Sequence, residues 1–290
     1  MIRFGNFLYI LPFLILFALL FLACQLTARF GKKFSRRLIL ILLWSNFALH
    51  FLKQLNPYYY NRLPGSLFEC TPLNFCAALI MMEPFIFLSK NKYMKDYAYY
   101  VGTLSSLAAY LFPGSPMSLD LSSVENFFEV VRYYSCHAPL LICGILMVRD
   151  GHHQIDYKRL WALPLIMVGV NLVIILDGLF FYAIGFPGFT QDWSYLIARD
   201  GPLSGAACFG PPMLTDKFLS PLYVIMLPGL QYYYNGAGEK CFTPGVWMLL
   251  PLYFVALVLG IPMSYPWQKH EMKCDLETIK QRIKMKIRAR

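Results

Sequence analysis

Seven polar residues of this chain lie inside apolar stretches and could do chemistry there: His50, Asn74, Cys76, His137, Asn171, Asp177 and Tyr253. A cysteine and a histidine within hydrogen-bond reach provide a thiolate nucleophile and a general base, which suits acyl transfer through a thioester. We therefore predict a catalytic group with His137 as the base and Cys76 as the nucleophile. Two further members, Asn171 and Asp177, would orient the histidine.

The remaining three residues are predicted to bind substrate. The amide of Asn74 could donate to a developing oxyanion, and His50 and Tyr253 lie at a similar depth in their spans. Each catalytic residue also has a plainer explanation. Cys76 could be an inert buried thiol, and His137, Asn171 and Asp177 could bond across helices. Cys136, the sequence neighbour of His137, falls on another face of the same helix and is predicted to be a packing residue.

Two competing functions therefore stay open beside an enzyme: a non-catalytic carrier of lipids or small molecules, and a structural accessory subunit. The chain contains no GxSxG, HExxH or P-loop motif, so serine hydrolase, zinc protease and ATPase functions lack support. Its eight cysteines form no CxxC pair and no Cys/His zinc spacing. We expect no metal and no cofactor.

The elements that must position these residues are membrane helices. Hydrophobic residues make up 58% of the chain and charged residues 14%, whereas globular domains average about half and about a quarter. About 20 apolar residues cross a bilayer as a helix, because unpaired backbone groups are costly in lipid. The sequence predicts an all-α polytopic bundle of about seven transmembrane helices, at 7–26, 38–55, 67–89, 94–112, 127–148, 160–182 and 243–265. Residues 1–265 form one domain.

Five of the polar residues share one depth in these spans: His50, Cys76, His137, Asn171 and Tyr253. Each lies about 17–20 Å above the inner end of its span at a rise of about 1.5 Å per residue. Residues placed at random would scatter in depth. The layer predicts a polar pocket in the outer half of the bundle, with Asn74 and Asp177 about one turn further out.

The charges orient the chain. Segments 27–37, 90–97, 149–159 and 266–290 hold 5, 3, 3 and 8 of the basic residues, 19 of the 26 Lys and Arg. By the positive-inside rule, we expect a multi-pass protein of the cell membrane with its N-terminus outside and its C-terminus in the cytoplasm. Cleavage of the first span as a signal peptide would leave segment 27–37 outside, so we expect that span to be retained. The net charge of +10 lies in these segments and does not indicate nucleic-acid binding.

Two further segments have their own predictions. Residues 183–242 form a long outer segment, rich in Gly and Pro, in which Phe218–Tyr234 is expected to be re-entrant or interfacial; Cys208 and Cys241 could be bridged there. The basic tail 266–290 contains a predicted amphipathic helix from Asp275. Such a helix can lie on an anionic leaflet or remain solvated. Membrane lipids are the expected partners, and the sequence does not indicate an oligomeric state.

Six short motifs resemble the YwaF family of bacterial integral membrane proteins over roughly residues 60–265. They are Leu73-Asn74-Phe75-Cys76, Lys90-Asn91-Lys92, Tyr100-Val101-Gly102, Tyr134-Ser135-Cys136-His137, Gly169-Val170-Asn171 and Pro244-Gly245-Val246-Trp247. The resemblance implies a bundle of six or seven helices. It also implies a relationship to animal phospholipid acyltransferases that pass a fatty acyl group through a cysteine near a histidine.

The resemblance places His137 on the family's histidine and Asn171 on an asparagine of its sixth helix. The chain departs from the pattern near the nucleophile, because Asn74 stands where a histidine is usual. Leu73 stands where the animal enzymes have their cysteine. Cys76, one turn away, matches a cysteine common among bacterial members, and Asp177 stands where an asparagine is usual.

Overall fold

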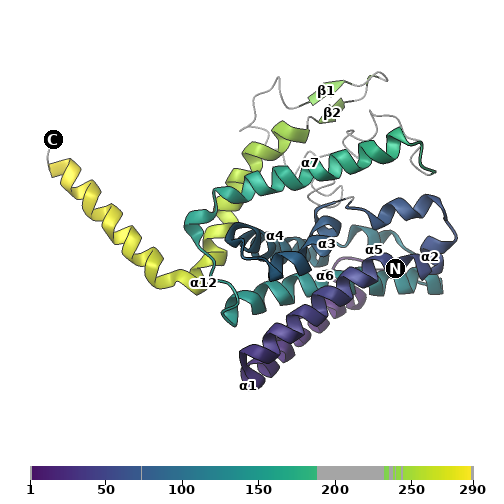
Figure 1. Cartoon of the computed structure of the whole chain (residues 1–290), viewed down its shortest axis with the longest axis horizontal. Helices are drawn as coiled ribbons and strands as arrows, with labels where there is room; N and C mark the ends of the chain where they lie inside the picture. The colour runs from purple at the N-terminus through teal and green to yellow at the C-terminus, as the bar shows by residue number, and fades with distance from the viewer. Residues whose placement is uncertain are drawn as a thin grey trace.

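A computed structural model describes residues 2–72, 74–187, 232–234, 238, 240–242 and 244–288. For Asn171 and Tyr253 it describes the backbone alone. The chain is predominantly helical (Figure 1). The elements are α1 (Phe7–Leu52), η1 (Lys53–Leu55), α2 (Pro57–Tyr60), η2 (Gly65–Cys70), α3 (Phe75–Leu88), α4 (Lys92–Leu111), α5 (Gly114–Ser118), α6 (Val124–Arg149), η3 (Tyr157–Arg159), α7 (Ala162–Ala183), β1 (Tyr232–Tyr234), β2 (Lys240–Phe242) and α12 (Pro244–Arg288).

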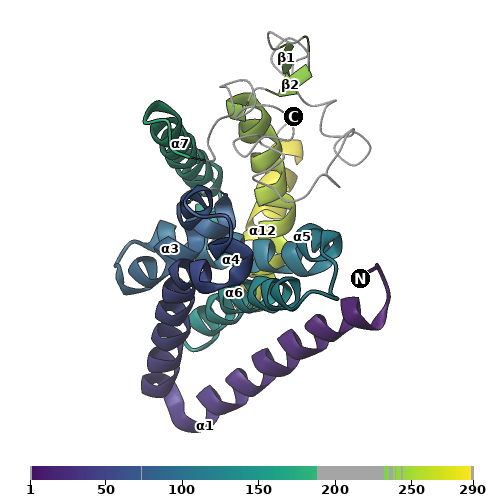
Figure 2. The ribbon, with the colours of Figure 1, turned by 90° about the vertical axis from the view of Figure 1, so that its right-hand side faces the viewer.

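Every predicted span coincides with helix, although the boundaries differ. The first two spans are the two arms of α1, and the predicted loop 27–37 is helical apart from a kink at Gly31. Gly31 has a φ of 78°, a left-handed conformation that only glycine adopts freely. Figure 2 shows the two arms meeting at a sharp angle. One residue therefore provides the turn that we assigned to a loop.

The third span is shorter than predicted. Helix α3 begins at Phe75, not at residue 67, because Asn74 caps it: the Asn74 Oδ1 accepts from the Ala77 N–H at 2.9 Å. The last span and the tail helix are one element, α12, whose regular geometry is interrupted only at Gln268. In the described part of the chain, three helices are long and apolar enough to cross a membrane: Phe7–Leu55, Val124–Arg149 and Ala162–Phe181.

The core of the bundle is the packing of α4 on α6, the most extensive contact between helices. A Cβ atom at Gly102 would lie 3.0 Å from Glu83 Oε1 and 3.4 Å from the Leu140 carbonyl oxygen, so this close approach of α4 to its neighbours needs a glycine. Helices α1 and α3 pack on one side of the α4–α6 pair, and α7 packs against α12, α4 and α3. Tyr100 joins α4 to α12, with its hydroxyl 2.6 Å from Ser264 Oγ.

Three basic segments, 27–37, 90–97 and 149–159, lie together at one end of the bundle, which we call the basic end. There Lys32 Nζ donates to the Gly151 carbonyl at 2.6 Å, and the Tyr157 N–H donates to Gln268 Oε1 at 2.9 Å. The N-terminus lies at the other end, where the Tyr9 hydroxyl donates to the Leu111 carbonyl at 3.0 Å. The predicted inner segments before α4 and after α6 thus share an end of the bundle with the kink of α1, opposite the N-terminus.

Most of the long outer segment lies outside the described residues, including Cys208. Of the predicted re-entrant stretch 218–234, only β1 is described, and it is a strand: Tyr232–Tyr234 pairs antiparallel with Lys240–Phe242.

Candidate functional site around His137

His137 lies on the middle turns of α6, and its backbone is fixed by neighbouring helices. The Cys136 carbonyl accepts from Asn46 Nδ2 of α1 at 2.9 Å, and the His137 carbonyl accepts from Ser106 Oγ of α4 at 2.8 Å. One turn earlier, the Tyr134 carbonyl accepts from the Tyr110 hydroxyl at 2.9 Å. Helix α6 thus holds the histidine by bonds from two other helices.

The imidazole of His137 has a defined tautomer. Its Nδ1 lies 2.7 Å from the Tyr133 carbonyl oxygen, one turn earlier on α6. A carbonyl only accepts, so Nδ1 carries the proton in this contact and the neutral ring keeps its lone pair on Nε2. The Tyr133 ring packs on the imidazole with centroids 4.5 Å apart. This arrangement leaves Nε2 as the basic atom.

Two thiols lie beside the imidazole. The side chain of Cys76, on the first turn of α3, lies close enough to the side chains of His137 and Tyr133 to interact with them electrostatically. The Sγ of Cys136 lies 3.5 Å from Nδ1 and donates to the Tyr133 carbonyl at 3.2 Å. The structure therefore brings together the predicted base and the predicted nucleophile from two helices.

Cys136 and Tyr133 were missed by the sequence reasoning. Cys136 was predicted to be a packing residue, and neither Tyr133 nor Tyr134 was assigned to the site, yet Cys136 and Tyr133 both lie against the imidazole. Helical spacing could have indicated one of them, because the carbonyl four residues before a histidine on a helix is within reach of its Nδ1. Tyr134 is buried, with 8% of its surface exposed, and so lies inside the bundle.

The other predicted site residues are not seen to join this pair. His50 Nε2 lies 3.1 Å from the Cys70 carbonyl of η2, and Asp177 interacts with the side chain of Thr71. Asn74 is exposed, and its oxygen is used in capping α3. The side chains of Asn171 and Tyr253 lie outside the described residues, so their roles stay predictions.

A buried ion pair lies one turn from Cys136 toward the start of α6. Arg132 Nε donates to Glu129 Oε2 at 2.7 Å, and the Tyr59 hydroxyl donates to Glu129 Oε1 at 2.8 Å. Arg132 Nη1 also lies 3.8 Å from Cys136 Sγ. A buried charge needs such partners, and here they put a cation next to the second thiol.

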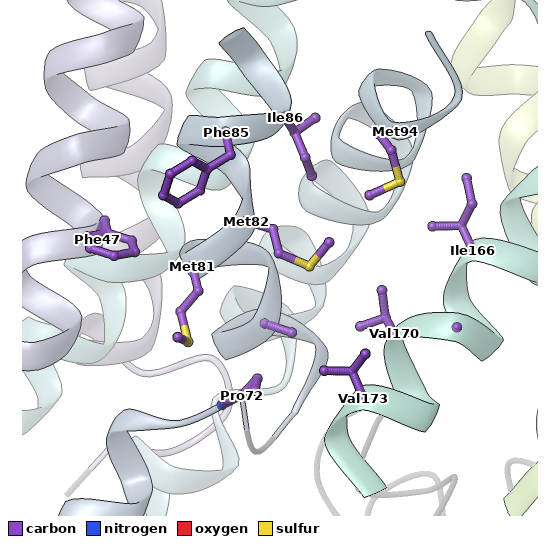
Figure 3. Close-up of a pocket in the computed structure, with 12 residues that line it drawn as sticks. Phe47, Pro72, Met81, Met82, Phe85, Ile86, Met94, Ile166, Val170 and Val173 are labelled. Carbon is purple, nitrogen blue, oxygen red and sulfur yellow. The ribbon is translucent and has the colours of Figure 1, made fainter. Parts of the chain in front are cut away.

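An apolar cavity of about 770 Å³ is lined by α3 and its neighbours (Figure 3), and helical spacing puts it on a different face of α3 from Cys76. Helical spacing explains the separation, because Ala78, Met82 and Phe85 share a face that Cys76 does not. The cavity is lined by apolar residues of α1, α3, α4 and α7, and neither Cys76 nor His137 is among them.

Comparison with known proteins gives a family. No curated protein and no solved structure matches the chain. A sequence model of the TMEM164 family matches residues 3–195, about two thirds of the chain. This is a membrane-protein family, as the apolar helices predict; the YwaF resemblance and its link to acyltransferases stay predictions. The chain therefore belongs to the TMEM164 family.

Proposed function

We propose that the protein is a membrane-embedded enzyme of lipid metabolism that transfers or hydrolyses a fatty acyl group through Cys76 and His137. The observation that carries the proposal is the fixed tautomer of His137, with its Nδ1 2.7 Å from the Tyr133 carbonyl and the Cys76 thiol near the ring. The basic Nε2 is then free to accept the thiol proton.

The chemistry follows in two steps. In the first, Nε2 of His137 takes the proton of Cys76, the thiolate attacks the acyl carbonyl carbon, and the ester C–O bond breaks. The departing alcohol of the lipid takes the proton from His137, leaving a thioester. In the second, His137 removes a proton from an acceptor hydroxyl or from water, whose oxygen attacks the thioester carbon and releases the thiol.

The most direct test is to measure which of the two thiols, Cys76 or Cys136, becomes acylated. We expect protein purified from membranes and incubated with a phospholipid that carries a labelled acyl chain to show label on Cys76 that hydroxylamine releases. Substitution Cys76→Ala should abolish this label, and Cys136→Ala should leave most of it, since Cys136 meets the ring at the protonated Nδ1. Label that persists in Cys76→Ala and vanishes in Cys136→Ala would contradict the assignment of the nucleophile.

A second candidate function is lipid binding without catalysis, and the cavity of about 770 Å³ favours it. Apolar cavities of this size suit acyl chains. Cysteines that acquire no acyl label, together with a lipid that co-purifies in a fixed ratio to the protein, would support this carrier function. An accessory subunit would show neither, and its polar residues would only fix helix packing.

We also propose the predicted orientation in the cell membrane, with the basic end in the cytoplasm. The part of α12 after Gln268 projects away from the bundle (Figure 1). It exposes apolar residues at helical spacing among basic ones, with Ile279, Ile283 and Ile287 each more than half exposed. This favours a helix that lies on an anionic leaflet.

The orientation is tested by reporter fusions. A reporter fused after Arg290 should be active only in the cytoplasm, and one inserted near Ser194 only outside, because 19 of the 26 basic residues fall in the predicted inner segments. Activity of the Arg290 fusion outside the cell would overturn the orientation.

A further inference from the structure

Two cations and a histidine lie around the ring of Phe87 at the basic end, remote from the Cys/His site. Arg36 Cζ of α1 lies 5.9 Å from the ring centroid, and Lys95 Nζ of α4 lies 5.8 Å from it. The ring of His152, in the connection after α6, lies 5.7 Å away, centroid to centroid. Phe87 is 11 residues from Cys76, or about 16 Å along a helix.

A third cation, Lys32, lies beside His152. Lys32 Nζ donates to the carbonyl of Gly151, the residue before His152. Three separate parts of the chain thus contribute a basic side chain to one place. The positive-inside rule explains why basic residues lie at this end, but it does not require them to converge on one ring.

The cluster lacks compensating carboxylates. In the described part of the chain, no ion pair joins Lys32, Arg36 or Lys95 to an acid. The carboxylate of Asp150, two residues before His152, is engaged by Ser35 Oγ at 2.6 Å and by Arg149 Nε at 3.3 Å. Asp96, the neighbour of Lys95, is paired with His153 and Arg159.

The neighbouring cations help to lower the pKa of His152. Burial lowers its pKa most, followed by the charge of Lys32, and Arg36 and Lys95 act in the same direction; only Asp150 opposes them. Like charges held together in a partly buried place repel one another. An anion bound among them would remove that repulsion.

The apolar cavity ends close to this cluster. Its lining includes Ile86 and Met94, the sequence neighbours of Phe87 and Lys95. Figure 3 shows Ile86 and Met94 at one end of the cavity and Pro72 and Val173 at the other. The cavity and the cluster thus share the end of α3 and the start of α4, which would let one lipid place its acyl chain in the cavity and its phosphate at the cluster.

We propose that Lys32, Arg36 and Lys95, beside His152, bind the phosphate group of an anionic lipid whose acyl chain lies in the apolar cavity. Basic pockets between membrane helices on the cytoplasmic side recognise such headgroups. The site is separate from Cys76 and His137, so it does not depend on the proposed acyl transfer.

Binding is measured on the full-length protein in neutral detergent with three probes. These are dioctanoyl phosphatidic acid, dioctanoylglycerol and inorganic phosphate. Phosphatidic acid should bind saturably. Dioctanoylglycerol should bind much more weakly because it lacks the phosphate, and inorganic phosphate should bind much more weakly because it lacks the acyl chains. Inorganic phosphate that binds as tightly as phosphatidic acid would overturn the lipid assignment.

The matched variants are Arg36→Gln/Lys95→Gln and Arg37→Gln/Lys92→Gln, which remove the same charge from the same two helices. The first pair should weaken binding of phosphatidic acid about 30-fold. The second pair, on exposed side chains outside the cluster, should weaken it less than about threefold.

Equal loss in the two double variants would overturn the proposal in favour of general surface attraction. Cys76→Ser should bind phosphatidic acid like the unaltered protein, which separates this site from the acyl-transfer proposal. A folded Arg36→Gln/Lys95→Gln protein with undiminished affinity would also contradict the site.

Discussion

Substitution His137→Gln is expected to lower acyl turnover by about 10²–10⁴-fold, the usual contribution of a positioned general base. A glutamine amide can still donate to the Tyr133 carbonyl that now lies 2.7 Å from His137 Nδ1. It cannot accept and return a proton in the way that Nε2 can. The substitution therefore removes the base while keeping a hydrogen bond of the ring.

The measurement is the rate at which a labelled acyl chain appears on Cys76 and leaves the phospholipid. Substitution His270→Gln is the matched control, because His270 is exposed on the projecting part of α12 and should change the rate less than about twofold. A rate in His137→Gln equal to that of the unaltered protein would exclude His137 as the base. Recording the thermal unfolding of both variants separates loss of chemistry from loss of fold.

Substitution Asp96→Ala is expected to destabilise the protein by about 3–5 kcal/mol, since it removes one member of a buried charged group. Asp96 is 4% exposed. Its Oδ1 lies 2.7 Å from His153 Nε2 and its Oδ2 accepts from Arg159 Nε at 2.5 Å. Without the carboxylate, Arg159 and His153 would face each other with no anion between them.

The exposed pair of Lys158 and Asp275 provides the control. Its atoms lie 2.6 Å apart, but the side chains are 60% and 39% exposed, so Lys158→Ala should cost about 1 kcal/mol or less. Denaturant unfolding in mixed micelles compares the two variants. If Asp96→Ala cost as little stability as Lys158→Ala, the connection between α4 and the segment before α7 would not depend on Asp96.

Helix positions could be predicted from the sequence because each apolar run is long enough to fix one. The arrangement of the chain between runs could not. Residues 27–37 look like a loop because they are polar, yet a helix can carry basic residues through the interface, and the whole turn requires only the left-handed Gly31. The start of α3 could not be predicted for a similar reason, since the cap at Asn74 depends on one side-chain hydrogen bond.

The sequence predicted how deep the site residues lie along their helices, but not in which direction each side chain faces. The rise per residue sets Cys76 and His137 at the same height, and they do meet. His50 has the same height and is instead bonded to the carbonyl of Cys70, because depth does not determine which way a helix face turns. Cys136 and Tyr133 were assigned elsewhere for the same reason, since their neighbours on α6 decide their direction.

The length of α3 has a consequence for the membrane around it. With 14 residues, the helix is about 21 Å long, against about 30 Å for the hydrocarbon layer. Such hydrophobic mismatch is relieved by thinning the bilayer or by shifting the helix along the membrane normal. Since α6 has 26 residues and is long enough to cross the layer, we expect bilayer thickness to change the height of the Cys76 thiol relative to the His137 imidazole, so that lipid composition affects the geometry of the site.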